Sequence, residues 1–100
     1  MGTAQQADGN GRVRMTAWVH GQVQGVGFRA WTQSEARRLN LEGWVCNEKD
    51  GTVCAVIAGT EAAVSAMLDA FMRGPDFATV SEVVWELADD EGPGGFRITG

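Results

Sequence analysis

Gly21, Gly25 and Gly27 lie between a segment that alternates like a β-strand and a segment with the periodicity of a helix. The alternation covers residues 12–20, where one side consists of Val13, Met15, Ala17 and Val19. Residues 28–40 follow with helical spacing of Phe28, Trp31, Thr32, Ala36 and Leu39. Three glycines in seven positions fit neither element. The sequence therefore predicts a strand, a tight loop over residues 21–27 and an amphipathic helix, in that order.

A β-hairpin is predicted next. Two short β-rich segments, residues 41–47 and 52–58, flank the sequence Glu-Lys-Asp-Gly. If Gly51 takes the left-handed position of a three-residue hairpin loop, two pairs of residues lie opposite each other: Asn47 with Val53 and Cys46 with Cys54.

The C-terminal part predicts a second helix and two more strands. Thr60 is a candidate N-cap, and Gly74-Pro75 ends the helix. The apolar stripe expected to enter the core consists of Val64, Met67, Leu68, Phe71 and Met72. Residues 79–88 alternate as a strand, 89–95 form an acidic turn-rich loop, and 96–99 form a short last strand. The four tryptophans fall in predicted elements and are interpreted as packing residues.

This order of elements, βαββαβ plus a short C-terminal strand, predicts an α+β fold of the ferredoxin-like, split βαβ type. Two helices would cover one face of a largely antiparallel sheet. With 100 residues and 44% hydrophobic side chains, we expect one domain over residues 12–100. Residues 1–11 have no periodicity and predict a flexible N-terminal tail.

Charge and composition exclude several classes of function. The net charge is −5, and residues 61–100 hold eight acidic side chains against two arginines, which argues against binding to nucleic acid. The longest apolar run, residues 53–58, is far shorter than the roughly 20 residues of a membrane helix, so no membrane span is expected. Two cysteines and one histidine are too few for a zinc site, and we expect no metal.

The glycine-rich loop is a candidate anion site. Consecutive backbone N–H groups at the positive end of a helix dipole form a cradle for phosphate, and the guanidinium of Arg29 can meet two phosphate oxygens at once. Spacing alone leaves a second interpretation open, a tight turn with a solvated arginine. The loop does not end in Gly-Lys-Ser/Thr, as a Walker-type nucleotide loop does, and it lacks the third glycine of the dinucleotide-binding fingerprint. Neither cysteine is followed by an arginine six positions later, as the cysteine phosphatases require. The sequence offers no candidate nucleophilic side chain. Any reaction must therefore use water as the nucleophile and a substrate that is already activated.

The segments VHGQVQGVGFRAW and EARRLNLEGWVCNEKDGTV resemble the acylphosphatase family, whose signature is GxVQGVGFR followed by GWVxN and a DG turn. The resemblance implies hydrolysis of a small acyl phosphate to a carboxylate and inorganic phosphate, without metal or cofactor, on a ferredoxin-like fold. It implies that Arg29 binds the phosphoryl group and that Asn47 orients the attacking water. The N–H groups that complete the cradle would be those of Gln24, Gly25, Val26, Gly27 and Phe28.

The sequence departs from the family pattern at Cys46 and Cys54, where polar or charged residues are expected on an open sheet face. Direct cross-strand neighbours lie a little too far apart for a good disulfide, so we expect two free thiols in a reducing cytoplasm. Asn40 replaces a glycine that the family often has before the second strand. This substitution is a small change, because asparagine tolerates the left-handed region of backbone conformation.

We expect a cytoplasmic monomer that inorganic phosphate or sulfate inhibits competitively. The alternatives are a non-catalytic small-anion-binding module, an RNA-recognition module and a domain related to those of carbamoyl-transfer proteins. The RNA alternative lacks an aromatic-rich sheet motif and has the wrong charge.

Overall fold

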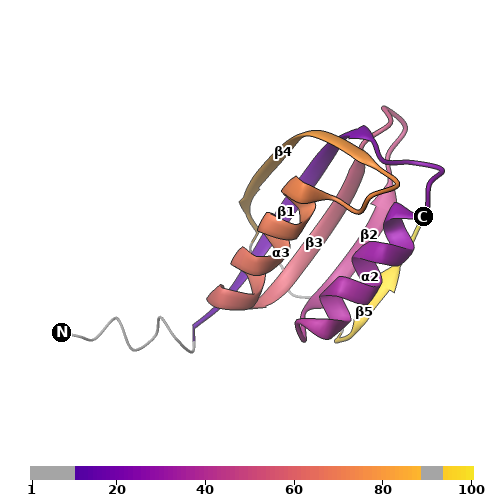
Figure 1. The fold of residues 1–100 in the computed structure, drawn as a ribbon. Helices are drawn as coiled ribbons and strands as arrows, with labels where there is room; N and C mark the ends of the chain where they lie inside the picture. The colour runs from indigo at the N-terminus through magenta and orange to yellow at the C-terminus, as the bar shows by residue number, and fades with distance from the viewer. Residues whose placement is uncertain (1–10, 89–93) are drawn as a thin grey trace.

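The computed structural model describes residues 11–88 and 94–100, which form a five-stranded sheet with two helices on one face (Figure 1). The predicted tail lies outside the described residues except for Gly11, and so does most of the predicted acidic loop. The elements in chain order are β1 (Arg12–Gln22), α2 (Phe28–Arg38), β2 (Glu42–Asn47), β3 (Val53–Thr60), α3 (Glu61–Arg73), β4 (Thr79–Leu87) and β5 (Phe96–Ile98).

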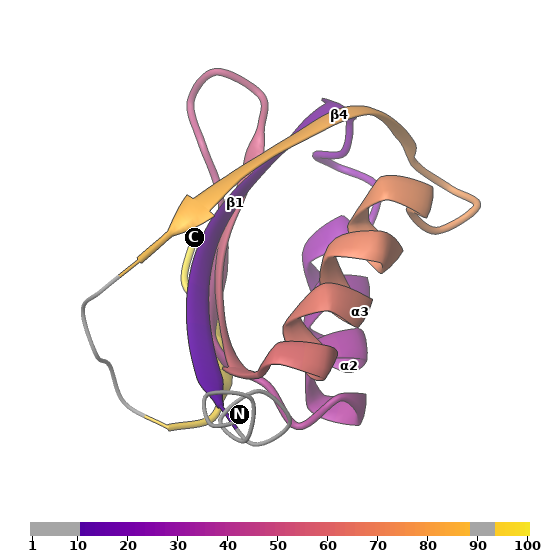
Figure 2. The ribbon, with the colours of Figure 1, turned by 90° about the vertical axis from the view of Figure 1, so that its left-hand side faces the viewer.

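The sheet has the strand order β4-β1-β3-β2-β5, and its pairs are antiparallel except for β2 with β5. Turned by 90°, the molecule shows α2 and α3 side by side over the same face (Figure 2). No helix of the described residues lies on the other face of the sheet. This arrangement confirms the predicted ferredoxin-like α+β fold.

The hairpin register is confirmed as well. Cys46 lies opposite Cys54 and Asn47 lies opposite Val53. Gly51 has a φ of 96°, the left-handed value that the prediction required.

The first strand runs two residues further than its predicted end at His20. A register shift falls between His20 and Gly21, and β4 passes so close that a Cβ at Gly21 would lie 2.1 Å from the backbone oxygen of Thr79. Only glycine allows this approach, and its φ is 131°. The glycine-rich loop therefore begins after Gln22, at the end of a strand that β4 holds in place.

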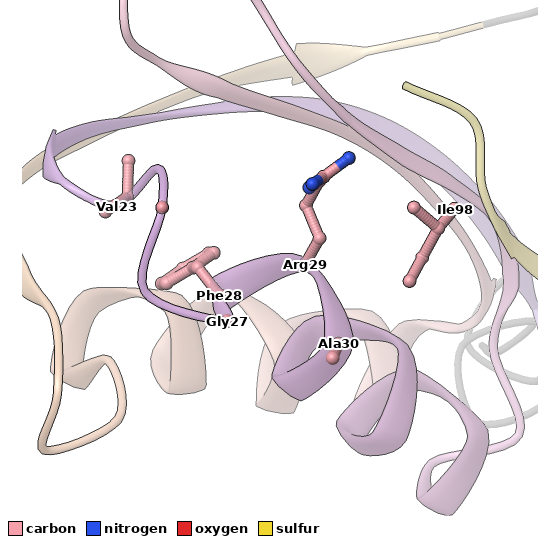
Figure 3. Close-up of a pocket in the computed structure, with 7 residues that line it drawn as sticks. Val23, Gly27, Phe28, Arg29, Ala30 and Ile98 are labelled. Carbon is pink, nitrogen blue, oxygen red and sulfur yellow. The ribbon is translucent and has the colours of Figure 1, made fainter.

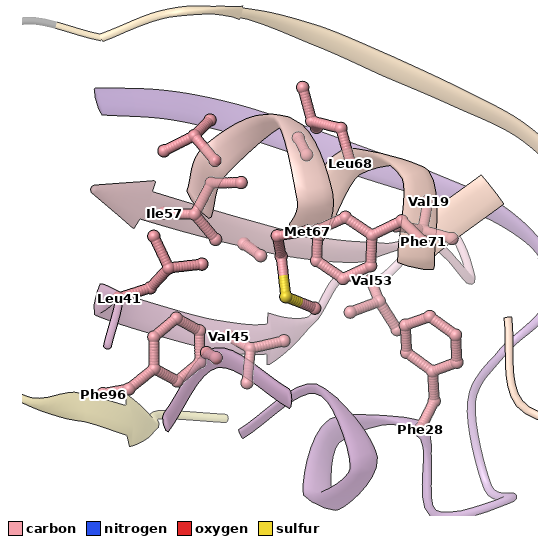
Figure 4. Packing of buried hydrophobic residues seen from close by; sticks show 14 of the residues in the cluster. Val19, Phe28, Leu41, Val45, Val53, Ile57, Met67, Leu68, Phe71 and Phe96 are labelled. Carbon is pink, nitrogen blue, oxygen red and sulfur yellow. The ribbon is translucent and has the colours of Figure 1, made fainter. Parts of the chain in front are cut away.

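The core lies between the sheet and the two helices (Figure 4). Its largest buried side chains include Phe71 and Met67 from α3 and Phe28 from α2. Two packing predictions were wrong: Met72 is 53% exposed and Trp85 is 48% exposed. Met72 lies in the last turn of α3, and β4 curves away from α3 in Figure 2, so the core does not reach these side chains.

Candidate active site

The loop between β1 and α2 keeps a group of backbone N–H donors unpaired. In the described part of the chain, the N–H groups of residues 24–28 donate to no other backbone group and to no side chain. Gly25 and Gly27 have φ values of 76° and 85°, and a Cβ at Gly25 would meet no atom within 4 Å. Gly27 is the N-cap of α2 and has no side chain that could cap the helix. Donors of this kind at the positive end of a helix can bind an anion.

Phe28 fixes this helix end on the core. It is 1% exposed, and its ring stacks on Phe71 of α3 with centroids 6.2 Å apart. Arg29 follows directly and is only partly buried. Together with the loop it borders a pocket of about 190 Å³ (Figure 3), lined by Val23, Gly25, Gly27, Phe28, Arg29, Ala30 and Ile98. The buried ring thus places a guanidinium beside the unpaired N–H groups.

Arg29 and Asn47 meet at one oxygen atom. The Nη1 atom of Arg29 donates to the backbone oxygen of Gly100, and the backbone N–H of Asn47 donates to the same oxygen at 3.2 Å. Gly100 reaches this place because its segment continues beside β2 after β5, with the Thr99 N–H bound to the Val45 oxygen at 2.9 Å. The fold therefore brings the two separated sequence motifs together.

Asn47 is the last residue of β2, on the face that the helices cover. Its cross-strand partner Val53 is completely buried, as is Val45 two residues earlier. The side-chain Oδ1 of Asn47 is buried and has no hydrogen-bond donor among the described residues. Buried acceptors in native proteins are paired with protein or with water. This oxygen is thus free to accept a hydrogen bond from a group outside the described residues, such as a water molecule.

The structure gathers part of the predicted site in the pocket, namely Gly25, Gly27, Phe28 and Arg29. Asn47 does not line this pocket and is connected to Arg29 through the Gly100 oxygen. Val26 packs, partly buried, against the core. The side chain of Gln24 turns away to the β2–β3 loop.

Sequence reasoning missed the apolar lining of the pocket and the role of Gly100. Val23, Ala30 and Ile98 line the pocket. The alternation of the last strand could have indicated Ile98, because Phe96 is buried and Ile98 lies on the same side. A backbone oxygen such as that of Gly100 carries no signal in the residue type.

The two cysteines are unpaired in the structure. Burial raises the pKa of Cys46, and the neighbouring carboxylate of Glu48 raises it further, while Thr99 and Arg29 act in the opposite direction. Burial raises the pKa of Cys54 to about 11. Both groups are therefore neutral thiols at pH 7, and neither is an activated nucleophile.

We expect thiol titration of unfolded protein, purified without reductant, to find two free groups per chain. In the folded protein both should react slowly at pH 7, because only the thiolate is reactive, and Cys54 should be the slower since it is also the more buried. Alkylation followed by mass spectrometry measures both rates. Finding no free thiol at monomeric mass would contradict the prediction.

Residues 11–88 and 94–100 hold no group of three or more His, Cys, Asp or Glu side chains that could bind a metal ion. Neither described helix is long and apolar enough to span a membrane.

Comparison with known proteins agrees with this geometry. The acylphosphatase family model matches residues 15–98. An acylphosphatase of Rhizobium meliloti is 57% identical over 82 residues, covering 81% of this chain and 86% of that protein. An acylphosphatase of Rhizobium etli is 53% identical over 95 residues, covering 94% of this chain and 99% of that protein. The solved structure of an acylphosphatase from Coxiella burnetii matches with a TM-score of 0.85 at 34% identity, over 90% of this chain and 94% of that one. The chain belongs to the acylphosphatase family, and its function is that of an acylphosphatase, a hydrolase with a small acyl phosphate as substrate.

Proposed function

We propose that Arg29 binds the phosphoryl group of the acyl phosphate, that the N–H groups of residues 24–28 complete the cradle, and that Asn47 orients the attacking water. The observation that carries the proposal is the shared Gly100 oxygen, which both Arg29 and the backbone of Asn47 contact. A group bound at Arg29 is then within reach of the end of β2. Water attacks phosphorus in line with the carboxylate leaving group, and no covalent intermediate forms.

The chemistry does not require a strong base. A carboxylate is a good leaving group, so the enzyme needs to bind the transition state better than the ground state and to hold water in line. None of the pocket residues carries a nucleophilic side chain. Cys46 is close enough for Arg29 to affect its pKa, but that pKa is raised, which disfavours a thiolate nucleophile.

The unpaired Oδ1 of Asn47 supports its role toward water. A primary amide offers one acceptor oxygen and two donor hydrogens. Because the oxygen has no donor among the described residues, it can accept a hydrogen from the attacking water and align a lone pair with the phosphorus. Orientation of this kind lowers the barrier without any proton transfer to Asn47.

The test of the mechanism is hydrolysis of an aryl acyl phosphate in the presence of EDTA. We expect turnover that EDTA does not reduce, with release of one phosphate per carboxylate. Phosphate binding without turnover would instead support the non-catalytic anion-binding module on the same fold.

Inorganic phosphate and sulfate are expected to inhibit competitively, because both resemble the phosphoryl end of the substrate and the cradle consists of N–H donors and a guanidinium. Inhibition should weaken as salt is added, since the attraction is charge-assisted. Inhibition constants measured over a range of NaCl concentrations check this. A constant independent of salt, or turnover unaffected by saturating phosphate, would contradict it.

We also propose that the enzyme acts as a monomer in the cytoplasm. The proposed site needs residues of one chain only, since Arg29, Asn47 and the loop come from the same sheet and helix layer. Two unpaired cysteines are typical of a reducing compartment.

A further inference from the structure

The two segments that carry the proposed site are not neighbours in the sheet. The proposed phosphate-binding loop, residues 23–27 and called the phosphate loop below, continues from β1. Asn47 ends β2, and β3 lies between these two strands. No ladder of backbone hydrogen bonds can therefore connect the loop directly to Asn47. Another contact must set the distance between the bound phosphoryl group and the water.

The side chain of Gln24 makes such a connection, in addition to the one from Arg29 through the Gly100 oxygen. Its Nε2 donates to the backbone oxygen of Glu48 at 2.8 Å and to that of Thr52 at 2.8 Å. A primary amide nitrogen has two hydrogens, so both are used, one on each side of the hairpin loop. Glu48 is the residue directly after Asn47.

The hairpin loop that Gln24 contacts is itself well fixed. The Glu48 N–H donates to the Thr52 oxygen at 2.9 Å, and the Gly51 N–H donates to the Glu48 oxygen at 3.2 Å. Asp50 Oδ1 accepts from the N–H and the hydroxyl of Thr52, at 3.0 and 2.7 Å, and these bonds lower its pKa. A loop held this way moves as a unit, so one contact from Gln24 locates its whole base, including Asn47.

We propose that Gln24 is a positioning residue whose side-chain amide sets the place of Asn47, and of the water it orients, relative to the phosphate loop. The proposal rests on the proposed roles of Arg29 and Asn47. It assigns the backbone N–H of Gln24 to the cradle and its side chain to the hairpin, so that substituting alanine removes only the second function. Catalysis is sensitive to misplacement of reacting groups on the scale of 1 Å.

The experiment is a double-mutant cycle with Asn47. Gln24→Ala should lower kcat by about 10-fold, while KM and the phosphate inhibition constant change by less than about twofold, because the cradle is kept. In an Asn47→Ala background the same substitution should lower kcat by less than about twofold further, since its effect passes through Asn47. Gln24→Glu should behave like Gln24→Ala, because a carboxylate has the same shape but cannot donate.

Gln22→Ala is the matched control. This glutamine lies two residues earlier, is exposed at the end of β1, and makes no side-chain hydrogen bond to the described residues, so its kinetics should equal those of the wild type. Unchanged kcat in Gln24→Ala, a loss that appears in KM and in phosphate inhibition, or losses that add to those of Asn47→Ala would each overturn the proposal. Wild-type enzyme that binds phosphate but shows no turnover would count against the mechanism itself.

Discussion

Arg29→Gln is expected to lower kcat/KM for an aryl acyl phosphate by about 10³-fold, with a higher KM and a lower kcat. The guanidinium can donate hydrogen bonds to two phosphoryl oxygens at once, and it stabilises the negative charge that develops on the equatorial oxygens in the transition state. Arg29→Lys should not restore activity, because an ammonium group cannot form two parallel hydrogen bonds. Steady-state kinetics with phosphate as competitor measure both effects.

Arg37→Gln provides the control for structural damage. Arg29 donates to the Gly100 oxygen, so its loss also removes a link between α2 and the segment after β5. Arg37 lies on the same helix and makes a comparable link, from Nη2 to the Phe96 oxygen at 3.3 Å, but it does not line the pocket. Both variants should lose similar stability in thermal unfolding, and only Arg29→Gln should lose activity. Equal losses of activity would show that Arg29 acts through the fold.

The elements of this fold could be predicted because their signals are local. Period-two alternation located β1, helical spacing located α2 and α3, and the one glycine at the hairpin loop was enough for the register of β2 and β3. The N-cap at Thr60 is an example of the same kind, since its hydroxyl accepts the Ala63 N–H at 3.1 Å. The end of β1 was placed too early because the reason for its extension is non-local. Gly21 lies in a strand since β4, which follows much later in the chain, passes next to it.

The site could be predicted only in part, for a related reason. Arg29 and the loop glycines follow from the strand–loop–helix pattern, and they line one pocket. The place where Arg29 meets Asn47 is a backbone oxygen of Gly100, which no residue type reveals. Gln24 was expected to contribute a backbone N–H, and its side chain reaches a hairpin loop 24 and 28 residues further along the chain. Contacts of this kind depend on the strand order, and periodicity does not contain that information.

Asn47→Ala is expected to lower kcat by about 10²-fold, with KM and phosphate inhibition nearly unchanged. If Asn47 contacts only the water, the variant binds the phosphoryl group as the wild type does. Its kcat is lower because the water is less often aligned for attack. Stability should change little, because no described residue donates to the Oδ1 that is removed, so no hydrogen bond within the described residues is lost at this oxygen. The backbone N–H of Asn47, which holds the Gly100 oxygen, is kept in this variant. Kinetics with an aryl acyl phosphate and thermal unfolding are the two measurements.

Asn40→Gly is the matched control variant, because it also removes an asparagine side chain. Asn40 follows α2 with a left-handed φ of 60°, which glycine adopts at no steric cost, and it does not line the pocket. Its kcat should equal that of the wild type. An Asn47→Ala enzyme with wild-type kcat, or with its whole loss in KM, would show that Asn47 only shapes the hairpin. Lower kcat together with unchanged phosphate inhibition and undiminished thermal stability is the combination that a role in shaping the turn does not produce, because a disturbed turn would also disturb the fold around it.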